Sequence, residues 1–280
     1  MLSVLKKGET NLTKDIDFMW NADLRLEIVD LVRRAGEGHI PSSFSIVDLV
    51  SAAYEDLLSL DSEDPDWCDR DRFILSKGHG AAALYVVLVR KGLLDPAELQ
   101  LYGTLEGRLG GHPDSKNTQF VESSTGSLGH GFPGGVGIAL GLRVKKSTGR
   151  VVVVLGDGEC QEGTIWEAAN IAANRYLNNM LAIVDWNESA AQLMPIDALP
   201  DKWRAFGWET IVINGHDREE IKEAFAYFKE RDDQRPMAVI ARTVKGKGVE
   251  FLEGHGMWHH RIPNEEEYLQ ICRCLAGAKA

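Results

Sequence analysis

The chain has 280 residues, with 31 Lys or Arg against 42 Asp or Glu, and so a formal net charge of -11. Its 44% apolar and 26% charged residues are typical of a globular protein and exclude a disordered chain. The negative surplus makes nucleic acid and anionic membranes poor partners. Because the longest apolar run, residues 81–89, is too short to span a membrane and the N-terminus lacks a signal peptide, we expect a cytoplasmic protein.

Helical patterns dominate the first hundred residues. Apolar residues recur at helical spacing over residues 24–35, and Ser45 opens a second pattern that runs to Leu58, with Asp48 completing a capping box. Asp95, followed by proline, starts a further helix. From 103 to 141, 11 of 39 residues are glycine, which predicts a loop that approaches something closely.

The rest of the chain alternates short β-branched runs with helical patterns. Such alternation is typical of parallel strands that are buried on both faces. We therefore expect an α/β fold with a doubly wound, mainly parallel sheet flanked by helices. It would form one domain over residues 1–280, with a helical N-terminal portion (about 15–100) packed on the sheet. The predicted strands are 151–155, 180–186, 209–213 and 237–244, and the predicted helices are 164–176, 199–206, 218–230 and 264–275.

Polar residues follow two of these strands directly. Asp157, flanked by Gly156 and Gly158, comes after the strand 151–155, and Asn187 comes after the next strand, thirty positions later. A strand, helix and next strand span about 30 residues, so both side chains should lie at the carboxyl edge of the sheet, where ligands bind. With the backbone carbonyl of Ser189 they form an oxygen set suited to Mg²⁺, and Ca²⁺ would accept the same ligands. Taken alone, this pattern could also be a strand-end turn followed by a helix cap.

The same segment resembles a known family. GDG followed about thirty residues later by Asn resembles the thiamine diphosphate signature, and GDGECQEGTIWEAANIAA resembles the cofactor-binding domain of transketolases. The resemblance runs from about Asp23 to Pro263. It includes the motifs EGHIPSS, DRDRFILSKGHG, GHP, TGSLGHG, GHD and MWHH, which begin at residues 37, 69, 111, 125, 215 and 257. Several motifs in the family order are more specific than any one of them.

This resemblance implies thiamine diphosphate as the cofactor and transfer of a two-carbon ketol unit between sugars as the reaction. His39 and His112 would contact the carbonyl and hydroxyl groups of the donor, and His259 would lie close to the reacting carbons. Histidine suits these positions because its usual pKa of about 6.5 allows proton exchange near neutrality. The implied cofactor-binding residues are His79, Gly126, Leu128, Gly156, Gly158, Glu162, Asn187 and His259.

Other candidate positions keep two interpretations. Glu162 and Glu167 are expected near a subunit interface, although two surface acids on a helix would look the same. His216 and His255 are as compatible with an ordinary structural role as with a functional one. Residues 129–134 match the dinucleotide fingerprint G-x-G-x-x-G, but no strand precedes them and proline stiffens the turn, so NAD binding is not expected.

The resemblance stops where the cofactor-diphosphate domain of transketolases ends. In that family a second domain grips the aminopyrimidine ring and supplies an activating glutamate. We therefore expect a C-terminal partner subunit that carries this domain, in an α2β2 assembly that acts on a sugar or sugar phosphate. The alternatives are a synthase that decarboxylates a 2-oxo acid and a noncatalytic, cofactor-binding role. The substrate is left open by departures from the family pattern at 40–43, Trp186, Glu188 and His260.

Overall fold

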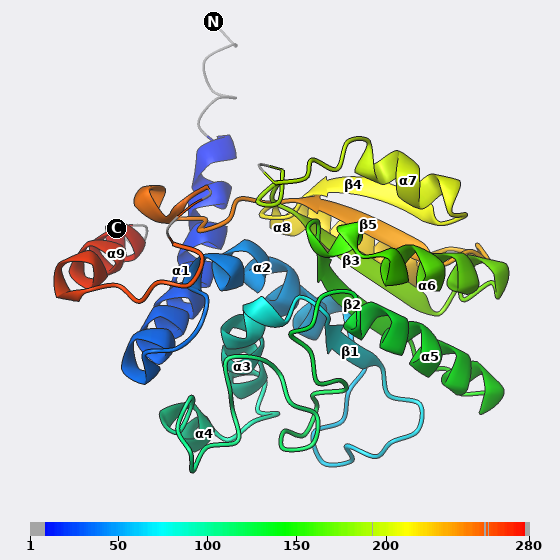
Figure 1. Cartoon of the computed structure of the whole chain (residues 1–280), viewed down its shortest axis with the longest axis horizontal. Helices are drawn as coiled ribbons and strands as arrows, with labels where there is room; N and C mark the ends of the chain where they lie inside the picture. Colours follow the sequence, from blue (N-terminus) through cyan, green and yellow to red (C-terminus); the bar gives the residue numbers. More distant parts are fainter. Residues whose placement is uncertain (1–8, 192, 255, 257, 278–280) are drawn as a thin grey trace, which may run out of the picture.

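The computed structural model describes residues 9–191, 193–254, 256 and 258–277. Figure 1 shows a sheet with helices on both of its faces. All strand pairs are parallel, and the order across the sheet is β1-β2-β3-β5-β4. The predicted α/β fold with a parallel sheet is confirmed. The strands are β1 (Arg72–Leu75), β2 (Val151–Gly156), β3 (Met180–Trp186), β4 (Glu209–Asn214) and β5 (Met237–Arg242).

The helices divide between two apolar cores, one on each face of the sheet. Along β2, Val152 and Val154 enter one core while Val151 and Val153 enter the other, as the alternation of side chains along a strand requires. The first core holds α1 (Glu9–Ala35), α2 (Ile40–Ala52), α3 (Ala81–Arg90), α8 (Arg218–Glu230) and α9 (Glu265–Gly277). The second core holds α5 (Gly131–Val144), α6 (Gly163–Asn174) and α7 (Leu199–Ala205). A short helix without fully buried residues, α4 (Pro96–Gln100), packs against the first core through Leu99.

Two of the expected helix starts carry the caps that the sequence indicates. The side chain of Asp95 accepts a hydrogen bond from the Ala97 N–H at 2.9 Å, at the start of α4. Asn264 accepts from the Glu267 N–H at 2.9 Å, and the Glu267 carboxylate accepts from the Asn264 N–H at 2.9 Å. These reciprocal bonds form a capping box at the start of α9.

The glycine-rich stretch 103–141 is not a loop throughout. Its last part forms α5, so that part of the prediction is wrong. The glycines there allow close packing of a helix on the sheet: a Cβ at Gly135 would lie 2.7 Å from the Val153 side chain, and one at Gly131 would lie 2.6 Å from Ser76 Oγ. Composition alone could not distinguish a flexible loop from a helix that needs small residues at its contact face.

Two predictions in the N-terminal hundred residues also need correction. The strand β1 lies within the portion that was expected to be mainly helical. It was not predicted because a strand of four residues is too short to show a period. The second helix begins at Ile40, with Pro41 in its first turn, rather than at Ser45. Ser45 is a buried residue inside α2, where its hydroxyl binds another side chain instead of capping the helix. Among the described residues, no helix is both long and apolar enough to cross a membrane.

Candidate active site

Each strand of the sheet is followed by polar residues at its carboxyl end. Because all the strands run parallel, these residues gather along one edge, which is where open α/β sheets bind ligands. Residues at or just beyond the ends of β1, β2, β3, β4 and β5 are, respectively, Lys77, Asp157, Asn187, His216 and Lys245. The sheet thus brings together residues that lie far apart in the sequence.

Asp157 and Asn187 follow neighbouring strands, as their spacing predicts. Gly156 pairs with Asp185 in the register of β2 and β3, and the Asp157 N–H donates to the Asp185 carbonyl at 3.1 Å. Asp157 is only 3% exposed, and its Oδ2 is buried without a hydrogen-bond partner among the described residues. Burial and the neighbouring Asp185 raise the pKa of the Asp157 carboxyl. This carboxylate therefore has an unused oxygen, and the nearby charge of Lys77 only partly offsets its burial beside Asp185.

The amide of Asn187 is held in one orientation. Its Nδ2 donates to Ser45 Oγ and to Asp185 Oδ2, both at 2.9 Å, while its Oδ1 accepts from the Ser189 N–H at 2.9 Å. The amide oxygen therefore faces the turn that carries Ser189. Since a carbonyl oxygen has two lone pairs, it can still accept a second partner.

Asp185 is the centre of this polar group, although it was not among the residues predicted from the sequence. It is fully buried in β3 and accepts hydrogen bonds from Ser45, Thr243 and Asn187. The ammonium group of Lys77 forms an ion pair with the same carboxylate. The available signal was an acidic residue inside an otherwise apolar strand, which is rare unless the charge is paired.

The histidines assigned by resemblance lie together. The ring of His39, at the start of α2, is 4.8 Å from that of His79, 5.9 Å from that of His112 and 5.3 Å from that of His259. His260 also joins the group, with its ring 4.6 Å from that of His39. Four separate chain segments thus meet at one imidazole cluster. The sequence of any one segment does not indicate that these rings come together.

Two imidazoles of the cluster, those of His39 and His79, are kept uncharged near neutral pH. Burial and the surrounding histidines lower the pKa of His39 to about 3. Burial, His112 and His259 lower the pKa of His79 to about 4. His39 Nδ1 is buried and has no hydrogen-bond partner among the described residues. Near neutral pH, His39 and His79 therefore offer neutral imidazoles that can donate to or accept from the hydroxyl and carbonyl groups of a ligand.

These lowered pKa values predict a loss of stability in acid. A histidine whose pKa is lower in the folded state contributes stability above its unfolded pKa of about 6.5, and this is lost as the pH falls towards the folded value. Between pH 7.5 and 5.5 we expect His39 and His79 together to cost about 2 kcal/mol, after discounting for solvent screening. Urea unfolding at both pH values measures the change. A His39→Gln/His79→Gln variant should lose less stability than the wild type, and an equal loss would contradict the prediction.

Two buried lysines add positive charge to the same edge. Lys77 and Lys245 are each 8% exposed. Lys245 Nζ lies 3.1 Å from His259 Nδ1, and burial together with the charge of Lys77 lowers the pKa of Lys245 to about 8. Two like charges held close together in a partly desolvated site favour an anionic ligand between them. Neither lysine was identified from the sequence, although Lys77 lies in the SKGHG motif.

A cavity of about 410 Å³ opens next to these groups. Pro41, Lys245 and His259 line it, together with Phe251 and Trp258. This volume is within the range of small-molecule sites. Its wall thus combines a cation and an imidazole with aromatic surface. His255, for which the sequence left two interpretations open, lies outside the described residues.

The remaining predicted residues have different surroundings. Gly126 has φ +138°, and a Cβ there would lie 2.9 Å from the His112 ring, so the position requires glycine. Leu128 is 38% exposed, and Glu162 and Glu167 are exposed in this chain. The buried acid nearby is instead Glu159, which accepts from Ser76 Oγ and from the Gly129 N–H.

The sequence of this chain is similar to those of known transketolases. Residues 19–277 match the family model described as transketolase, thiamine diphosphate binding domain. The chain is 36% identical over 255 residues to one of the subunits of an apulose-4-phosphate transketolase from Phocaeicola vulgatus, covering 89% of this chain and 90% of the relative. It is also 36% identical over 259 residues to a 6-deoxy-6-sulfo-D-fructose transketolase subunit from a Clostridium species, covering 90% and 94%.

Solved structures show the same likeness. The crystal structure of transketolase from Campylobacter jejuni superimposes with a TM-score of 0.85 at 29% identity, covering 93% of this chain and 43% of that chain. The chain thus spans less than half the length of the solved transketolase that it matches. The matched region contains the polar strand ends and the histidine cluster. The predicted family is confirmed: this chain belongs to the transketolase family and carries its thiamine diphosphate-binding domain.

Proposed function

We propose that this chain is the thiamine diphosphate subunit of a two-subunit transketolase. The assembled enzyme would move a two-carbon ketol unit from a ketose to an aldose. The donor would leave as an aldose two carbons shorter, and the acceptor would become a ketose two carbons longer. The whole chain would act as one domain that holds the diphosphate end of the cofactor.

One observation carries the proposal. The site combines a buried carboxylate that a cation would stabilise, Asp157, with a buried ammonium group that an anion would stabilise, Lys245. The pKa of Asp157 is raised by burial and by Asp185, so a cation beside it would stabilise the carboxylate. The pKa of Lys245 is lowered by burial and by Lys77, so an anion there would stabilise the ammonium. A divalent cation bound to a diphosphate supplies both charges in one ligand.

The residues present fit such a ligand. Asp157 Oδ2, without a partner among the described residues, the Asn187 amide oxygen and the Ser189 carbonyl would hold Mg²⁺, which prefers few protein ligands and completes its shell with phosphate oxygens and water. Lys77 and Lys245 would face the diphosphate. Further cofactor contacts would come from His79 and His259, from the backbone of Gly126, Leu128, Gly156 and Gly158, and from Glu162.

The histidine cluster would handle the sugar. When bound, thiamine diphosphate supplies the nucleophilic carbon that takes up the two-carbon unit. His39, His112 and His259 would orient the donor carbonyl and hydroxyl groups and exchange protons with those hydroxyls. Because the pKa of His39 is lowered to about 3, its imidazole is neutral near pH 7 and can donate or accept hydrogen bonds with the donor's carbonyl and hydroxyl groups.

The proposal also requires a second chain. Two relatives are named as subunits of transketolases, and each matches this chain over nearly its full length. A partner with the pyrimidine-binding domain and its activating glutamate would complete the site, and an α2β2 assembly would satisfy twofold symmetry.

The test is affinity capture of the tagged chain from its native lysate, with thiamine diphosphate and Mg²⁺ present. Mass spectrometry should identify a near-stoichiometric second chain that contains a pyrimidine-binding domain. The captured pair should then release a shortened aldose from a ketose donor in the presence of an aldose acceptor. The isolated chain, assayed alongside, should show no turnover.

Two outcomes would contradict the proposal. Capture of the chain only with itself would remove the source of the activating glutamate and favour a noncatalytic cofactor-binding role. Release of CO₂ from pyruvate by the captured pair, without ketol transfer, would favour a 2-oxo-acid synthase.

A further inference from the structure

A buried ion pair lies behind the cofactor site, between α1 and α2. Arg25 is 1% exposed and Asp48 is 5% exposed. The guanidinium donates to both carboxylate oxygens, at 3.2 Å and 2.9 Å, and also to the carbonyls of Asn21 and Phe44. Burial alone would raise the pKa of Asp48, but the charge of Arg25 and hydrogen bonds from His216 and Arg25 lower it to about 2. Asp48 is therefore a permanent anion inside the protein.

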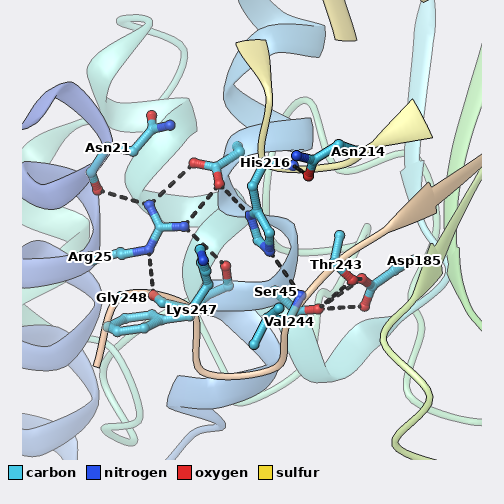
Figure 2. A network of polar contacts seen from close by, with 12 residues as sticks. Asn21, Arg25, Ser45, Asp185, Asn214, His216, Thr243, Val244, Lys247 and Gly248 are labelled. Atoms are coloured by element: carbon cyan, nitrogen blue, oxygen red, sulfur yellow. Dashed lines mark hydrogen bonds and ion pairs between the residues drawn. The ribbon is translucent and has the colours of Figure 1, made fainter. Parts of the chain in front are cut away.

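His216 connects this ion pair to the segment that follows β5. Its Nδ1 lies 2.7 Å from Asp48 Oδ2, and its Nε2 accepts a hydrogen bond from the Val244 N–H at 2.8 Å (Figure 2). A backbone N–H can only donate, so Nε2 carries no proton, and Nδ1 is the atom that donates to Asp48. Both ring nitrogens are thus used, in one tautomer. Of the two interpretations that the sequence left open for His216, these hydrogen bonds support the structural one, because the ring is held within the fold.

The ion pair also holds the other end of the same turn. Arg25 Nε donates to the carbonyl of Lys247 at 2.9 Å, as Figure 2 shows. Between these two contacts, the Gly246 N–H donates to the Pro41 carbonyl at 3.1 Å. Gly246 has φ +83°, and a Cβ there would lie 2.1 Å from the Leu252 carbonyl oxygen. The turn from Val244 to Lys247 is therefore fixed at both ends and in the middle.

Lys245 is the side chain that this turn presents to the site. It is 8% exposed, and its Nζ lies 3.1 Å from His259 Nδ1. A lysine side chain has four rotatable bonds, so holding it in one conformation costs conformational entropy. Placing its ammonium group in a partly desolvated position near a second ammonium is also unfavourable. A rigid backbone is what keeps such a side chain in place.

We propose that Arg25, Asp48 and His216 form a positioning network that fixes Lys245 against the diphosphate of the cofactor. The inference rests on the proposed function for the identity of the ligand. The three residues act through the Val244–Lys247 turn and touch neither cofactor nor substrate. A buried ion pair adds little net stability compared with apolar packing, so its use here is consistent with a role in specifying one backbone conformation.

The first experiment needs no cofactor. In the full chain, the pH dependence of Lys245 acetylation by acetic anhydride, measured by mass spectrometry, reports its pKa. The wild type should give about 8. His216→Phe keeps an aromatic ring but loses both ring nitrogens, and so it releases the turn. Lys245 can then reach solvent, and the pKa of Lys245 should rise towards its usual 10.5. An unchanged Lys245 pKa in a folded His216→Phe variant would overturn the network.

Two further variants separate positioning from folding. His216→Asn keeps a donor for Asp48 but is too short to accept from the Val244 N–H, so it should fold and still raise the Lys245 pKa. His216→Gln is long enough to offer both a donor and an acceptor, and should keep the Lys245 pKa close to the wild-type value. Equal behaviour of the Asn and Gln variants would contradict a role through Val244.

The second experiment uses the assembled two-subunit enzyme. The KM for thiamine diphosphate should rise about tenfold in His216→Asn, the size expected for a misplaced charged hydrogen-bond donor, with kcat at saturating cofactor unchanged. Lys245→Met should raise the same KM, and adding His216→Asn to it should have no further effect. Independent, multiplicative losses would refute positioning through Lys245. If the wild-type assembly binds no thiamine diphosphate, the proposed function fails, while the acetylation result still decides the network.

Discussion

Replacement of Asp157 by alanine is expected to reduce ketol transfer by the assembled enzyme by more than 100-fold. Loss of a residue that only supports a metal ligand typically costs about 10- to 100-fold, so loss of the ligand itself should cost more. The cofactor-free chain should not be destabilised. The Asp157 carboxylate is 3% exposed, its pKa is raised, and its Oδ2 has no partner among the described residues, so removing it relieves an unfavourable burial.

The measurement pairs steady-state activity with thermal unfolding of the cofactor-free chain. Asp201→Ala, which removes an exposed carboxylate on α7, is the matched control and should leave both values unchanged. Added thiamine diphosphate and Mg²⁺ should raise the melting temperature of the wild-type assembly but not that of Asp157→Ala. Retained activity in this variant would mean that the catalytic interpretation of the site is wrong.

The fold was largely predictable because its parallel strands are buried on both faces. Runs such as 151–155 and 180–184 are continuous and apolar, and such runs leave few alternatives. The spacing of Asp157 and Asn187 then placed two polar groups at one edge of the sheet, and the register of β2 and β3 confirms that placement. Their roles as metal ligands stay a prediction. Where a periodic signal was too short, as in β1, the sequence was uninformative.

Much of the candidate site depends on contacts that no local pattern contains. Ser45 has the sequence context of a helix cap, yet it lies inside α2, where its hydroxyl donates to Asp185, 140 residues away. Lys77 and Lys245 look like ordinary surface lysines, and they become parts of a site only when β1 and β5 end at the same edge. The family resemblance located the histidines, but burial and charge had to come from the structure.

The Lys77–Asp185 ion pair leads to the second large prediction, which concerns stability. Lys77 is 8% exposed and Asp185 is fully buried. Removing one partner of a buried pair leaves an uncompensated charge, and this typically costs about 3–5 kcal/mol. We therefore expect Lys77→Met to lower the free energy of unfolding by that amount and the melting temperature by roughly 10 °C. Lys202→Met, at an exposed position on α7, is the control and should change neither.

A double variant separates the structural effect from the binding effect. Lys77→Met/Asp185→Asn removes the unpaired carboxylate and keeps an oxygen that can accept from Ser45 or Thr243, so it should recover part of the lost stability. It should not recover affinity for thiamine diphosphate, since the positive charge proposed to face the diphosphate is still missing. Isothermal titration of the assembled variants with thiamine diphosphate and Mg²⁺ measures that affinity. If affinity returned together with stability, Lys77 would act only through the fold, and the charge complementarity proposed for this edge of the sheet would rest on Lys245 alone.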